Sequence, residues 1–158
     1  MTETLPGSAR WDERHRAREV ALRALYQHQV GHVPLADALQ LAEQDDVEDE
    51  ERIELDGPGR TYATRLATGT WQARETLDAT IEPHLINWRL ERIAVIDRLV
   101  LWLAVREWLA EPGTPPRVVL SEALELARSY SGDAAVRFIN GVLDAVYHRL
   151  KQEGRIID

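Results

Sequence analysis

The sequence predicts an all-α protein of about seven helices, and three observations support this class. Apolar residues recur three and four positions apart along most of the chain, the spacing of an amphipathic helix. No stretch alternates apolar and polar residues as a half-buried strand does. Clusters of glycine and proline separate the periodic stretches, and these residues end helices.

The first expected helix, from about Asp12 to Gln29, combines an apolar stripe with a row of arginines. The stripe has helical spacing and consists of Ala17, Val20, Ala21, Ala24 and Leu25. The arginines flank it at Arg14, Arg16, Arg18 and Arg23. Leu22 and Tyr26 lie opposite the stripe, so each needs a second contact, either inside the bundle or with a partner.

Six further helices are expected along the rest of the chain. They lie near residues 34–42, 60–81, 83–88, 92–110, 117–130 and 133–150. Gly57-Pro58-Gly59 is expected to break the chain, and Ser131 or Asp133 to cap the last helix. Gly141, inside that helix, is expected to permit a close helix contact. We expect a mobile tail at residues 1–10, a helical domain at 11–150 and a second tail at 151–158.

Charge is segregated along the 158 residues, whose net charge is −8. Residues 37–56 contain ten acids and one arginine, whereas residues 10–23 contain five arginines and three acids. The acidic run is either a solvated loop or a docking segment for a basic partner. The arginine row is either a solvated helix face or a site for phosphates, because guanidinium groups bind phosphates and stack on bases. A neighbouring aromatic residue favours single-stranded RNA over a duplex.

Several function classes lack support in the sequence. Cysteine is absent, which excludes disulfides, thiolate nucleophiles and cysteine-bound zinc. We found no glycine-rich phosphate loop and no hydrolase or metalloprotease motif. His28 and His32 have a spacing that can bind metal, but no third ligand is near. We therefore expect no catalysis, no metal and no cofactor. Without an apolar leader or spanning segment, we expect a soluble cytoplasmic protein with no membrane partner.

Several blocks of sequence resemble the transcription antitermination factor NusB family. Two near the start, Arg14-His15-Arg16-Ala17-Arg18-Glu19 and Ala24-Leu25-Tyr26, resemble the family's opening helix. Leu90–Ile93 and Val95–Arg98 resemble its central segment. Glu122–Ala127 and Phe138-Ile139-Asn140-Gly141-Val142-Leu143-Asp144 resemble its last two helices, and the final block is the most specific. The blocks occur in family order from Arg14 to Leu150.

The resemblance implies a NusB-like domain of two packed three-helix bundles without catalysis. It implies pairing with the small-subunit ribosomal protein NusE, binding of boxA single-stranded RNA in nascent ribosomal RNA transcripts, and action within the RNA polymerase antitermination complex. The RNA-binding residues it implies are Arg14, His15, Arg16, Arg18 and Phe138. Phe138 would stack on bases, with a core aromatic as the alternative. Contact with NusE is implied for Tyr26 and Asp97, and NusE could also cover Leu22.

The chain departs from the family pattern at a few positions. Asp133-Ala134-Ala135 stands where an acid-acid-serine start to the last helix is usual, and Trp102 stands where arginine is common. Both departures bear on the RNA surface. A helical adaptor that binds only proteins remains the alternative function. Whether the chain forms a homodimer stays open, and an RNA methyltransferase is set aside for want of a cysteine and a cofactor domain.

Overall fold

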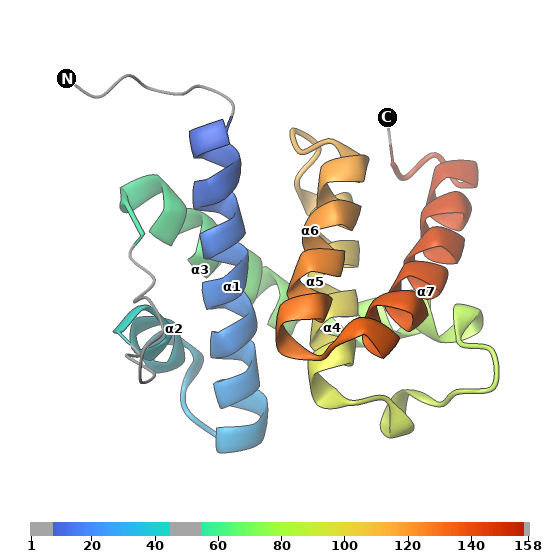
Figure 1. The fold of residues 1–158 in the computed structure, drawn as a ribbon, viewed down its shortest axis with the longest axis horizontal. Coiled ribbons are helices and arrows are strands. Elements are labelled where there is room, and N and C mark those ends of the chain that lie inside the picture. The colour runs from blue at the N-terminus through green and yellow to red at the C-terminus, as the bar shows by residue number, and fades with distance from the viewer. Residues whose placement is uncertain (1–7, 45–54, 157–158) are drawn as a thin grey trace. The chain divides into compact units, whose positions relative to one another are not determined.

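The computed structural model describes residues 8–44 and 55–156, and side chains within 13–43 and 55–156. These residues form seven α-helices and two short 3-10 helices, with no strand in the described part (Figure 1). In chain order they are α1 (Ser8–Gly31), α2 (Leu35–Gln44), α3 (Gly57–Gln72), α4 (Arg74–Ile81), η1 (Glu82–His84), η2 (Leu90–Arg92), α5 (Val95–Ala110), α6 (Pro116–Tyr130) and α7 (Asp133–Gln152). The all-α class is confirmed. Most of the acidic run lies outside the described residues.

The chain divides into two compact units, Met1–Thr68 and Gly69–Asp158, and the boundary falls inside α3. In the first unit, α1 packs along α2. In the second unit, α6 packs against both α5 and α7, and α4 packs against α5 (Figure 1). The first unit thus has three helices, as expected, and the second has three long helices and the short α4.

Helix α1 is buried on more of its surface than the stripe predicts. The residues at most 2% exposed are Ala17, Arg18, Val20, Ala21, Leu22, Ala24 and Leu25. Since a helix turns about 100° per residue, they cover roughly 200° of its circumference. The helix begins at Ser8, four residues before the expected start.

Helix α3 starts at the glycine-proline cluster that was expected to break the chain. The backbone N–H of Gly59 donates to Asp56 Oδ1 at 2.6 Å, so Asp56 caps the helix and Pro58 occupies its first turn, where proline is tolerated. A Cβ on Gly59 would collide with Glu13 Oε1. The expected long helix from here to Ile81 is interrupted at Ala73, between α3 and α4.

Asp78 of α4 ties that helix to α5. Arg98 donates to both of its carboxylate oxygens, at 3.3 and 2.6 Å, and the indole N–H of Trp102 donates to Oδ1 at 2.7 Å. Trp102 is only 2% exposed. In this chain the position where the family often has arginine therefore serves the core, not the surface.

The ends of α7 differ from expectation. Gly132, at a φ of 114°, is the N-cap residue and no side chain caps the helix. This backbone conformation favours glycine. A Cβ on Gly141 would meet nothing within 4 Å, so the expected close contact at Gly141 is absent among the described residues. Beyond the helix, Ile156 is buried, which extends the packed region into the expected C-terminal tail.

Candidate RNA and partner interface

The outward side of α1 carries part of the predicted basic site. The side chains of His15, Arg16 and Arg23 are 31%, 53% and 20% exposed. Each lies near an acid of the same helix. His15 Nε2 is 3.3 Å and Arg23 Nη2 is 3.9 Å from Glu19. Arg16 Nη1 is 3.6 Å from Glu13. A phosphate binding here would compete with these weak surface pairs.

The other two predicted arginines of α1 are organised by Tyr62 of α3, a ring that is 4% exposed. The guanidinium carbons of Arg14 and Arg18 lie 4.7 and 6.0 Å from its centroid. Arg65 of α3 adds a third guanidinium at 5.2 Å. Such contacts hold a cation over the electron-rich face of the ring.

Arg18 lies on the packed side of α1. Its side chain is buried, with 2% of the residue exposed, so it does not present a charge to a ligand. Arg18 packs between α1 and α3, and its contact with RNA stays a prediction. Arg14 is half-buried at the same ring and remains nearer the surface.

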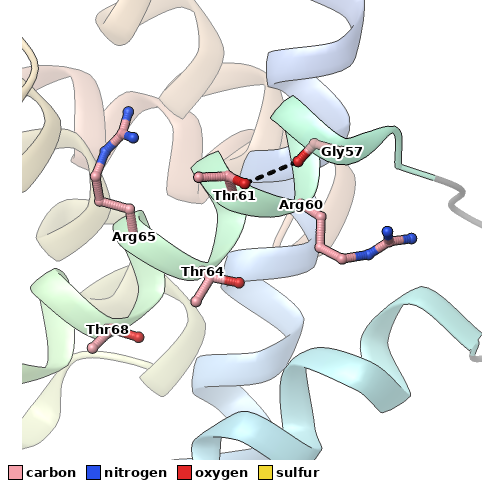
Figure 2. A pocket seen from close by; sticks show the side chains of 6 residues that line it. All are labelled: Gly57, Arg60, Thr61, Thr64, Arg65 and Thr68. Carbon is pink, nitrogen blue, oxygen red and sulfur yellow. Dashed lines mark hydrogen bonds between the residues drawn. The ribbon is translucent and has the colours of Figure 1, made fainter.

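A shallow hollow of about 460 Å³ lies on α3 in the same unit. Its lining residues are Gly57, Arg60, Thr61, Thr64, Arg65 and Thr68 (Figure 2). Arg60 and Arg65 point away from each other in Figure 2. Arg60 donates twice to Glu43, each at 2.9 Å, and this carboxylate raises the pKa of Arg60 by hydrogen bonding and charge attraction. The hollow has no converging functional groups, so we assign it no role.

In the second unit, Phe138 contacts a second aromatic residue that the sequence analysis missed. Phe138 is partly exposed near the start of α7. Its ring centroid lies 5.5 Å from that of Trp88, and the planes are inclined by 59°. Trp88 is 54% exposed and lies outside any helix, although it was expected to end one. The sequence could have indicated this residue, because a tryptophan in a turn-forming stretch is not explained by packing in a core.

Of the residues predicted to contact a partner, some are buried and others are exposed, as is true of the arginines. Leu22 is fully buried, so its second contact is internal and it is not a surface residue. Tyr26 is 36% exposed, and Val30, one turn further along α1, is 46% exposed. The two form an apolar strip on the exposed side of α1.

Asp97 lies in the first turn of α5 and is 9% exposed. Its Oδ1 atom accepts no hydrogen bond from any described residue. A buried polar atom without a partner is costly, and because this oxygen has less than 1 Å² of accessible surface, a partner could reach it only after a local rearrangement. Tyr26 and Asp97 belong to different units.

His28 has a structural role. Its Nδ1 atom is 2.7 Å from the carbonyl oxygen of Val33, which fixes the end of α1. His32 has a positive φ of 57° in the turn that follows. No group of three or more potential metal-binding side chains occurs in the part of the chain that the structure describes. No described helix has the length and apolar character needed to cross a bilayer.

Comparison with known proteins identifies the family. The sequence model of the NusB family matches residues 15–148. The chain belongs to the NusB family. The transcription antitermination protein NusB of Lysinibacillus sphaericus is 40% identical over 132 residues, which cover 83% of this chain and 94% of the relative. NusB of Symbiobacterium thermophilum is 36% identical over 139 residues, covering 87% and 91%.

Solved NusB structures share the fold. T. maritima NusB matches with a TM-score of 0.74 and 30% identity, covering 85% of this chain and 90% of that one. NusB from a crystal structure of the antitermination factors NusB and NusE with double-stranded RNA matches with a TM-score of 0.73. It is 24% identical and covers 87% of this chain and 98% of that one.

Proposed function

We propose that this NusB-family chain is a transcription antitermination factor that binds boxA-type single-stranded RNA together with the ribosomal protein NusE. Its relatives are transcription antitermination proteins, and a structural neighbour was crystallised with NusE and double-stranded RNA. On this proposal the chain works by binding alone, within the RNA polymerase antitermination complex. It would then act in the cytoplasm, where transcripts are made.

The basic, solvent-facing side of α1 is the observation that carries the RNA half of the proposal. His15, Arg16 and Arg23 project from one helix, and Arg14 lies on another side of that helix, against Tyr62. Exposed arginines attract phosphates without regard to sequence. Since the whole chain carries a net charge of −8, we expect weak RNA binding by the isolated protein and tighter binding once a basic partner adds positive surface.

The partner half rests on two features. Tyr26 and Val30 expose an apolar strip on α1, and Asp97 holds a carboxylate oxygen without a donor among the described residues. A tyrosine anchor is typical of interface hot spots. We therefore propose that NusE covers Tyr26 and contacts Asp97.

Fluorescence anisotropy of a labelled boxA-like single strand, with and without NusE, tests the proposal. We expect NusE to tighten binding and a scrambled strand to bind less well. Arg16→Ala is the informative variant, and Arg128→Ala is its matched control. Both arginines are about half exposed, at 53% and 51%, and both lie near an acid three residues earlier.

Arg16→Ala should weaken binding and reduce the slope of log K against log salt by about 0.7, the value for one phosphate contact on a single strand. Arg128→Ala should change neither quantity. If the RNA does not bind even with NusE present, the proposal is contradicted, and a helical adaptor that binds only proteins becomes the better interpretation of this chain's function. Equal effects of the two substitutions would show that general charge, rather than α1, attracts the RNA.

A further inference from the structure

We infer that Trp88 is a further base-stacking residue. It would extend the stacking role that the family resemblance implies for Phe138 into a two-ring platform for unpaired bases of a single-stranded RNA, with Arg89, Arg92 and Arg137 holding the flanking phosphates. This inference rests on the proposed function and adds to it Trp88, in the second unit of the chain, a residue that the sequence analysis did not assign to RNA. Its core is the ring contact between Trp88 and Phe138, at 5.5 Å between centroids.

The backbone around Trp88 turns its side chain outward. Leu85 and Leu90 are buried and anchor the two ends of the segment. Between them, Asn87 adopts a left-handed conformation with a φ of 64°, which asparagine tolerates better than most residues. As a result Ile86 is 79% exposed and Trp88 is 54% exposed.

Exposure on this scale is hard to explain by folding alone. Tryptophan is among the side chains that gain most from burial, and the other described tryptophan rings lie largely within the protein. Trp102 and Trp108, for example, are 2% and 6% exposed. The inclination of 59° to Phe138 also prevents the two rings from covering each other's faces. Ring surface is therefore left available to a flat ligand.

Charge indicates which ligand this is. Arg89 and Arg137 directly adjoin the two aromatic residues in the sequence, and Arg92 follows in η2. All three are exposed. Their side chains form no hydrogen bond or ion pair with any residue that the structure describes. Glu91 is the one acid between Trp88 and Arg92, so the cations outnumber it.

Exposed aromatic rings whose sequence neighbours are arginines, with no partner among the described residues, suit a single-stranded nucleic acid. Every base has a face that can stack, and the phosphates between bases satisfy the guanidinium groups. An apolar protein surface would fit less well, because docking on Trp88 would remove water from arginines that have no partner in the described part of the chain. We therefore commit to single-stranded RNA, and a protein partner is the outcome that would overturn the inference.

Substitutions at Trp88 separate stacking from simple apolar contact. Trp88→Leu keeps an apolar side chain without a ring, Trp88→Phe keeps a ring, and Ile86→Ala is the control in the same loop. With NusE present, we expect Trp88→Leu to weaken binding of the boxA-like strand about tenfold. Trp88→Phe should stay within about threefold of the unsubstituted protein, and Ile86→Ala should not change affinity.

Tryptophan fluorescence gives an independent reading of the same contact. The RNA should quench emission of the unsubstituted protein, and most of that quenching should be lost in Trp88→Phe although RNA still binds. Thermal melting of each variant should match that of the unsubstituted protein, because Trp88 is exposed.

Unchanged RNA affinity in Trp88→Leu would overturn the inference. The inference would also be overturned if a Trp88 variant no longer bound NusE but still bound RNA, since the segment would then be a protein-docking surface. Failure of the inference is distinct from failure of the proposed function. If Arg16→Ala weakens RNA binding and Trp88→Leu does not, the proposed RNA-binding function is supported and base stacking at Trp88 is contradicted. If the unsubstituted protein does not bind RNA, both the proposed function and the stacking inference are contradicted.

Discussion

Helix α1 and the segment around Trp88 hold their candidate ligand-binding side chains in opposite ways. On α1, Arg14 and Arg18 are held at Tyr62, and Arg16 lies near an acid. Around Trp88 the ring is exposed, and Arg89 forms no side-chain bond with the described residues. The difference suggests a division of labour, in which α1 attracts phosphates from a fixed position and the second unit receives bases.

The comparison also separates residues that look alike in sequence. Along α1, Leu22 and Arg18 serve packing, whereas Tyr26 and Arg16 reach the surface. The predictions below compare a packed residue with an exposed one wherever the chain offers such a pair.

The largest effect is expected from Leu22→Ala. Leu22 is 0% exposed, and the cavity left by this substitution should lower the free energy of unfolding by about 2–5 kcal/mol. Tyr26→Ala should change that free energy by less than about 1 kcal/mol and instead weaken NusE binding about tenfold. Denaturant titration measures the first quantity, and calorimetric titration with NusE measures the second. The reverse assignment of the two effects would contradict the structure.

Arg18→Ala should destabilise the protein by about 2 kcal/mol, because the buried guanidinium loses its contact with Tyr62. For a chain of this size the melting temperature should fall by about 4–8 °C. Arg16→Ala, at a half-exposed surface position, should leave the melting temperature within about 1 °C. Differential scanning calorimetry on both variants checks the pair, and equal shifts would show that Arg18 is not a packing residue.

Gly141→Ala should raise the free energy of unfolding by about 0.5–1 kcal/mol, the cost of glycine inside a helix. The structure leaves room for the methyl group, which denaturant titration can verify. If the variant is more stable but binds RNA or NusE less tightly, a ligand approaches α7 at this position. If the variant is instead less stable, another helix lies close to Gly141, as expected from the sequence.

The smallest effect concerns the C-terminal end of α7. Arg149 and Arg155 lower the pKa of Glu153 from its ordinary 4.5 by hydrogen bonds to its carboxylate. Because the folded state favours the charged form, this contribution is present above the ordinary pKa and is lost as the pH falls through the lower, folded value. Thermal melts from pH 7 to pH 3 should show slightly less acid sensitivity in Glu153→Gln than in the unsubstituted protein. The group is fully exposed, so the difference should be small.

Periodicity predicted most of the fold. The apolar spacing located α1, α2, α5, α6 and α7 to within a few residues. It failed where a local interaction outweighs a general tendency, as at Gly57-Pro58-Gly59, where Asp56 caps α3 and turns a breaker into a helix start. It also failed at Gly132, whose backbone conformation replaces a side-chain cap.

The candidate site was only partly predictable, because burial depends on contacts between distant segments. The arginine spacing could not distinguish Arg18 from Arg16, since Tyr62 lies 44 residues beyond Arg18 in the chain. Leu22 is buried although it lies outside the apolar stripe, so the extent of burial round α1 was not visible in the stripe. Trp88 was missed for a related reason, because its partner Phe138 comes from another part of the chain.

The most direct test of the division of labour is the salt dependence of single-stranded RNA binding by the complex with NusE. It should be measured for the unsubstituted protein, Arg16→Ala and Trp88→Leu. The account predicts that Arg16→Ala flattens the slope of log K against log salt by about 0.7. Trp88→Leu should lower affinity by a similar factor at every salt concentration and keep the slope. An unchanged slope in Arg16→Ala, or full affinity in Trp88→Leu, would contradict it.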